Sequence, residues 1–119
     1  MQKNSVNRVL IVGHLGANPE GRYTSSGKPV SSFSIATNEI WKNQSGEQEE
    51  HTEWHSVVVW DKLADFVQQY LYKGQLVSVE GRLRSRVWES KDGHKNKITE
   101  IVASSIVPLE WSLEKSKKT

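Results

Sequence analysis

The sequence predicts a mainly β structure, a five-stranded Greek-key barrel with one α-helix between the third and fourth strands. Five segments alternate apolar and polar side chains with the two-residue period of strands, and one segment changes to the helical period. Turn residues separate the strands, and the alternating strand and helix pattern of a parallel sheet is absent. This order is that of an OB-fold, although other small Greek-key barrels share much of the pattern.

The first three strands come before the helix. Strand one is expected over residues 6–12 and resumes at residues 22–24, bent or bulged by the glycine- and proline-containing stretch between them. Strand two is expected over residues 30–41. Residues 42–50 are polar and predict a mobile hairpin loop, after which strand three covers residues 52–60.

The helix is the segment with the clearest period. Asp61 is expected as its N-cap, Lys73-Gly74 as its stop, and apolar residues fall at helical spacing at Leu63, Phe66, Val67, Tyr70 and Leu71. Strand four follows over residues 76–88, Asp92-Gly93 turns the chain, and strand five covers residues 97–109. Residues 1–110 are thus expected to form one domain, with residues 111–119 as a short basic tail.

Composition narrows the function classes. A chain of 119 residues with no Cys suits one small domain and excludes disulfides, a thiol nucleophile and Cys-ligated metals. The apolar run at residues 9–12 is too short for a signal peptide or a membrane span, so a soluble, cytoplasmic protein without membrane contact is expected. Net charge is only +2, but five Trp outnumber three Tyr and two Phe. A small polar domain cannot easily bury five indoles, so some are expected to be exposed.

Strand four carries the strongest local signal. Its even-numbered positions form one face, which holds Arg82, Arg84, Arg86 and Trp88. Guanidinium groups bind phosphate and an indole stacks on unpaired bases, so this face predicts single-strand binding. The alternative is a solvated outer face with ion pairs to Glu80 and Glu89.

Strand three offers a second aromatic face. Trp54 and Trp60 share one side, opposite Val57 and Val59. Core packing is the alternative for the two indoles, although the opposite side already supplies core residues. Trp41 is expected as either a strand-end cap or a third stacking residue. Trp111 lies beyond the last strand, where a packing or tail role is preferred.

Catalytic and metal-binding signals are weak. Residues 13–16 lack the following helix and the Lys-Ser/Thr pair of a phosphate loop, and the four histidines show no ligand spacing. The acidic run at residues 47–53 is more typical of a solvated loop than of a cation site. No nucleophile, base and orienting residue form a set, so no enzyme activity, metal or cofactor is expected.

Taken together, several motifs resemble the bacterial-type single-stranded DNA-binding protein family over about residues 6–109. They are Asn7-Arg8-Val9, Gly13-His14-Leu15-Gly16, Pro19-Glu20-Gly21-Arg22-Tyr23, Ala36-Thr37-Asn38, Thr52-Glu53-Trp54-His55, Lys62-Leu63-Ala64, Tyr70-Leu71-Tyr72-Lys73-Gly74 and Val79-Glu80-Gly81-Arg82-Leu83-Arg84. The resemblance implies an OB-fold protomer, usually a homotetramer, that wraps single-stranded DNA without chemistry. It implies a role in DNA replication, recombination and repair, and association with the nucleoid.

The resemblance also assigns residues. The stacking aromatics of the family fall on Trp41, Trp54, Trp60 and Trp88, with an indole at position 60 where Phe is common. The family's phosphate contacts fall on Arg22, Lys42, Lys62, Lys73, Arg84 and Arg86, and His55 matches a histidine associated with subunit contacts. Strand parity adds Arg82 to the phosphate contacts.

Two questions stay open at this stage. Many bacterial members continue to an acidic tip that recruits replication and repair proteins, whereas this sequence ends in Lys115, Lys117, Lys118 and Thr119. Either the sequence is truncated before such a tip or this member lacks it. With the lysine-rich end, DNA binding is expected without recruitment of such partners. The alternative functions are an OB-fold accessory module, such as a primosome component or RNA binder, and, more remotely, a metal-dependent nuclease.

Overall fold

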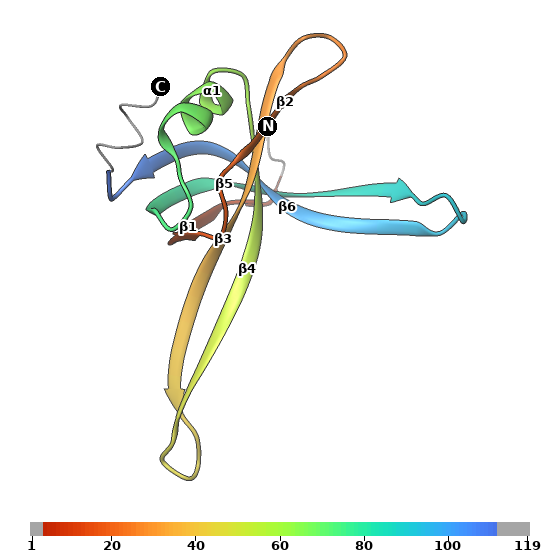
Figure 1. The fold of residues 1–119 in the computed structure, drawn as a ribbon. Helices are drawn as coiled ribbons and strands as arrows, with labels where there is room; N and C mark the ends of the chain where they lie inside the picture. The colour runs from red at the N-terminus through yellow and green to blue at the C-terminus, as the bar shows by residue number, and fades with distance from the viewer. Residues whose placement is uncertain (1–3, 112–119) are drawn as a thin grey trace.

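The computed structural model describes residues 4–111, which form a barrel with two projecting hairpins (Figure 1). Its elements are β1 (Val9–Leu15), β2 (Glu20–Tyr23), β3 (Pro29–Lys42), β4 (Gln48–Trp60), α1 (Asp61–Tyr70), β5 (Leu76–Glu89) and β6 (Lys95–Pro108). The strand order is β1-β5-β6-β4-β3-β2, and an additional β1–β3 pairing closes the barrel. The predicted five-stranded barrel with a helix between the third and fourth strands is confirmed, with the bent first strand divided into β1 and β2.

Closure of the barrel depends on a glycine in β1. Residues of β1 pair with β5 from Val9 to His14, and its end also pairs with β3 through His14 and Leu15. A Cβ atom at Gly13 would lie 2.2 Å from the carbonyl oxygen of Ala36. Only a residue without a side chain allows the two backbones to approach this closely, so Gly13 permits β1 to change partner.

Three hairpin loops of the barrel share one design. The loops cover residues 24–28, 43–47 and 90–94, and each has a glycine with positive φ at its fourth position. In each loop the glycine N–H donates to the carbonyl of the first residue, at 2.9–3.0 Å, and the first and fifth residues pair through their backbones. Such a five-residue loop ends one strand and starts the next in a fixed register.

The core is formed by inward-facing residues of β1, β3, β4, β5 and β6 together with the helix. Phe33 and Ile35 pack with Val57 and Val59, and α1 adds Ala64 and Val67. The side chain of Ser31 lies 2.6 Å from that of Gln68 and fastens the helix to β3. The predicted Asp61 N-cap is wrong: Trp60 holds the cap position without a side-chain hydrogen bond, because β4 continues directly into the helix.

The two long hairpins project from the barrel in different directions (Figure 1). We call residues 38–53 of β3 and β4 the β3–β4 arm, and residues 82–100 of β5 and β6 the β5–β6 arm. The predicted loop at residues 42–50 is confirmed only for residues 43–47, because β3 extends to Lys42 and β4 begins at Gln48. Within residues 4–111, no helix is long and apolar enough to cross a membrane.

Candidate nucleic-acid interface

The outer face of the barrel brings the two predicted binding strands together. Val58 of β4 pairs with Val102 of β6, and Val102 pairs in turn with Arg82 of β5. Because side chains alternate along each strand, the even-numbered residues of β4, of β5 and of β6 up to Val102 point to the same side. Beyond Ala103 a bulge in the β5–β6 ladder reverses this numbering in β6. We call this side the outer face; on it lie Trp54, Trp60, Arg82, Arg84, Arg86 and Trp88. The structure thus places these predicted site residues on one surface.

The indoles on this face differ in exposure. Trp54 of β4 is 59% exposed and Trp88 of β5 is 49% exposed, whereas Trp60 is half-buried at the junction with the helix. An exposed indole offers a π-face to an unpaired base without losing core contacts. Of the predicted stacking residues on this face, Trp54 and Trp88 are therefore the most accessible, and Trp60 exposes only part of its ring.

The Trp54 indole rests on the turn after β1. A Cβ atom at Gly16 would lie 2.4 Å from Cζ3 of this indole, so the missing side chain makes room for the ring. Beside Trp54, the mouth of the barrel holds a cavity of about 350 Å³, lined by His55, Leu83, Ile101 and neighbouring residues of β1. The ring therefore packs on the turn after β1 and also borders the cavity at the barrel mouth.

Trp41 lies on the other side of the β3–β4 ladder. It pairs with Glu49, whereas Trp54 pairs with Ala36, and the ladder is regular between these two positions. Trp41 is 44% exposed, and its ring centroid lies 6.3 Å from that of His51. The structure therefore does not bring Trp41 onto the face that holds Trp54 and Trp88, and its stacking role stays a prediction.

Carboxylates dominate the β3–β4 arm. The arm carries the predicted phosphate contact Lys42 together with Glu39, Glu47, Glu49, Glu50 and Glu53. The pKa of Glu53 is lowered, first by a hydrogen bond from His51 and then by the charges of His51 and His55. This carboxylate therefore remains charged to lower pH than usual, and its small contribution to stability is lost as pH falls. A phosphate near Lys42 meets more negative than positive charge.

The β5–β6 arm is basic. It carries Arg82, Arg84, Arg86, Lys91, Lys95 and Lys97 against Glu89, Asp92 and Glu100. At its tip the pKa of Asp92 is lowered by hydrogen bonds, first from Ser90 and then from His94. A phosphate backbone that follows the outer face of this arm meets a net positive surface.

A residue that the sequence did not single out holds two of the arginines. Oε1 of Glu100 accepts from Nη2 of Arg84 at 2.8 Å and from Nε of Arg86 at 3.2 Å. From the sequence, Glu80 and Glu89 were the candidate ion-pair partners of the arginines on β5. Glu80 instead pairs with Arg8 at 2.9 Å, so the first of those candidate partners is wrong.

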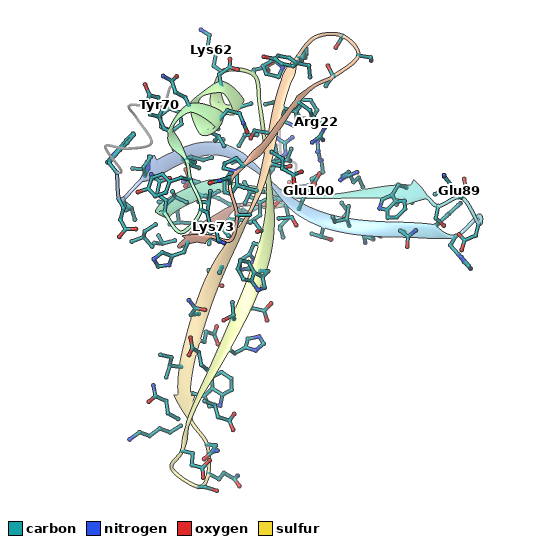
Figure 2. All side chains as sticks on the ribbon, viewed as in Figure 1. Arg22, Lys62, Tyr70, Lys73, Glu89 and Glu100 are labelled. Atoms are coloured by element: carbon teal, nitrogen blue, oxygen red, sulfur yellow. The ribbon has the colours of Figure 1, made fainter. Side chains whose placement is uncertain are left out.

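Three further predicted contacts lie near the helix (Figure 2). Arg22 of β2 is exposed and pairs with Val30, which pairs in turn with Trp60, so Arg22 continues the outer face across β3. Lys62 is exposed in the first turn of α1, and exposed Lys73 follows the helix, where its backbone N–H donates to Oδ1 of Asn18 at 2.8 Å. Their phosphate contacts stay predictions.

His55 faces inward, in contrast to its neighbour Trp54. Its Nε2 lies 2.9 Å from Oγ1 of Thr37, and the ring is half-buried at the barrel mouth. The subunit contact of His55 stays a prediction. Among the described residues, no group of three or more His, Asp and Glu side chains is placed to hold a metal ion.

Trp111 packs on the helix side of the molecule. Its ring meets that of Tyr70 edge to face, with centroids 5.5 Å apart, and Glu110 accepts from the side chain of Gln75. Of the packing or tail role expected for Trp111, the structure shows packing against Tyr70. The rest of the predicted tail, residues 112–119 with its lysines, lies outside the described residues.

Known proteins share both this sequence and this fold. The chain is 49% identical over 105 residues to single-stranded DNA-binding protein 1 of Chlorobaculum tepidum, covering 87% of this chain and 65% of that protein. It is 44% identical over 105 residues to the single-stranded DNA-binding protein of Neisseria meningitidis serogroup A, covering 88% of this chain and 60% of that protein. The chain thus spans less than two thirds of these curated relatives.

Two solved structures have the same fold. A Plasmodium falciparum SSB in complex with ssDNA matches with a TM-score of 0.81 and 34% identity, over 92% of this chain and all of that chain. A deletion mutant of the single-stranded DNA-binding protein from Thermus aquaticus matches with a TM-score of 0.76 and 34% identity, over 88% of this chain and 51% of that one. A family model described as the single-strand binding protein family matches residues 6–109, and the chain therefore belongs to this family.

Proposed function

We propose that this chain binds single-stranded DNA without catalysing a reaction and with little sequence preference. Bases stack on exposed indoles of the outer face, and arginines of the β5–β6 arm meet the phosphates. Every base has a π-face and every nucleotide a phosphate, so this chemistry does not depend on sequence. The function fits a role in DNA replication, recombination and repair in the cytoplasm, at the nucleoid.

One observation carries the proposal. Trp54 and Trp88, 59% and 49% exposed, share the outer face with three arginines in a row. A core role would bury the indoles, and a merely solvated face would have no use for two large exposed rings. The ssDNA complex of the Plasmodium falciparum relative supports this reading of the same fold.

The salt dependence of binding tests the phosphate contacts. For a short oligo(dT), each phosphate neutralised should add about −0.7 to the slope of log K against log salt. Arg82→Gln should therefore make the slope shallower by up to about 0.7. The measurement is fluorescence anisotropy of labelled oligo(dT) at several NaCl concentrations.

Lys97→Gln is the matched control, because Lys97 pairs with Val87 on the opposite side of the same arm. Equal slopes for the two variants would contradict the assignment of Arg82 to the DNA path. Competition between oligo(dT) and oligo(U) of equal length separates the alternative of an RNA-binding accessory module, which would prefer the RNA.

We further propose that the chain assembles as a homotetramer. An apolar patch is exposed on the outer side of β1 and at the end of β6. It is made of Leu10 and Val12 of β1, Val107 of β6, and Leu109, which follows β6. Val12 and Val107 flank Ser78 in one row across the sheet. Within the described residues, the edge of β1 from residue 9 to 13 has no strand partner other than β5, so a second copy can pair along it.

A further inference from the structure

Glu100 lies among the groups that the proposed function assigns to phosphate. It is directly opposite Arg84 in the β5–β6 ladder, and Arg86 lies two positions further toward the tip of the arm, on the same face. Its side chain is 7% exposed, whereas those of Arg84 and Arg86 are 37% and 53% exposed. The carboxylate therefore lies beneath two guanidinium groups that face solvent above it.

The contact takes donors that a phosphate would otherwise use. A guanidinium has five N–H groups and binds phosphate best through two of them at once. Glu100 takes one N–H from an Nη2 and one from an Nε, so it occupies part of both arginines. Two positive charges against one negative charge leave this cluster with a net charge of only +1.

The contact with Glu100 orients the Arg84 side chain, although it leaves another donor of Arg84 without an acceptor. Nε of Arg84 is buried and has no hydrogen-bond partner among residues 4–111. Leaving a buried N–H without an acceptor is unfavourable. The Nη2 contact to the buried carboxylate therefore decides where this side chain lies when DNA is absent.

We propose that Glu100 is a built-in competitor of the DNA phosphates for Arg84 and Arg86. The inference rests on the proposed phosphate role of these two arginines. In the free chain the carboxylate accepts hydrogen bonds from both guanidinium groups. It also repels a phosphate that approaches the same two groups. Glu100 thus weakens DNA binding and eases release of the strand.

Glu100→Gln tests the inference, since it removes the charge and keeps the side-chain size. The variant should bind a (dT) oligomer of about 15 nucleotides more tightly than the wild type. The slope of log K against log salt should become steeper by up to about 0.7, so a fourfold fall in salt strengthens binding by about 2.6-fold more than in the wild type.

Glu89→Gln is the matched control for net charge. Glu89 lies near the tip of the β5–β6 arm, opposite Lys95 and away from Glu100 (Figure 2). It should change affinity and slope much less than Glu100→Gln. Equal effects of the two variants would overturn the inference, because they would show only a change in overall charge. Weaker binding by Glu100→Gln would also overturn it and would make Glu100 a support for the arginines.

A double-mutant cycle separates this inference from the proposed function. In a chain with Arg84→Gln and Arg86→Gln, the added effect of Glu100→Gln should fall to that of the Glu89 control. If the two arginine changes leave affinity and slope unaltered, the phosphate role itself is wrong and the inference falls with it. If Glu100→Gln lowers the melting temperature, Glu100→Asp gives a second reading: it keeps the charge, withdraws the carboxylate, and should tighten binding to a smaller extent.

Discussion

Replacing Trp54 or Trp88 with alanine should weaken binding of single-stranded DNA by about 1–3 kcal/mol each, or about 5- to 150-fold in affinity. Both indoles are exposed on the outer face, so each loss removes a stacking surface for one base. The free energy of unfolding should change by no more than about 0.5 kcal/mol, as for other exposed residues. Titration with labelled oligo(dT) and thermal unfolding measure the two effects separately.

Trp111→Ala is the matched control for the loss of an indole. Trp111 is 58% exposed but packs on Tyr70, away from the outer face. Its replacement should leave affinity for oligo(dT) nearly unchanged. If Trp54→Ala or Trp88→Ala instead unfolds well below the wild type and binds normally once folded, that indole is a core residue and the stacking assignment fails.

A charge placed on the apolar patch should dissociate the tetramer. Val12→Glu would bring an ionised carboxylate into a contact between apolar side chains, which costs about 3 kcal/mol or more without a partner for the charge. Val12 is 51% exposed in the single chain, so the barrel itself should still fold. Light scattering should fall from four times the 13.5 kDa chain mass to a smaller species.

Ile40→Glu is the control for this experiment, because Ile40 is 60% exposed on the β3–β4 arm, away from the patch. It should leave the mass unchanged. A wild-type chain that scatters as a 13.5 kDa monomer at micromolar concentration would contradict the proposed assembly and would favour an accessory module. A mass that is the same for the wild type and Val12→Glu would place the interface elsewhere.

Where one side of a strand is buried, the sequence predicted the fold well. The alternation around Val57 and Val59 identified β4, and the helical spacing from Leu63 to Tyr70 identified α1, because each pattern has a core to face. The same parity argument placed Trp54 on one face of β4 and the arginines on one face of β5. That these two faces form one surface follows from the pairing of both strands with β6, which no local pattern predicts.

Where neither side of a strand is buried, the sequence pattern did not predict the structure. Residues 48–50 of the β3–β4 arm are polar on both sides, so the sequence predicts a loop there, although these residues pair in register with β3.

Glu100 was missed because its partner depends on the length of the loop at residues 90–94. A two-residue turn centred on Asp92-Gly93 would pair Arg84 with Ile101, whereas the observed five-residue loop pairs it with Glu100. A shift of one residue in the register moves every side chain of one strand to the opposite face of the arm.

Indole emission during titration with poly(dT) tests the central claim most directly, namely that bases stack on tryptophans of the outer face. Stacked bases should quench the emission until all chains are bound, at a constant number of nucleotides per chain, and the quenching should shrink in Trp54→Ala and Trp88→Ala. Sedimentation measures binding independently of the indoles. Emission that stays constant while poly(dT) is bound, or the absence of binding, would contradict the account.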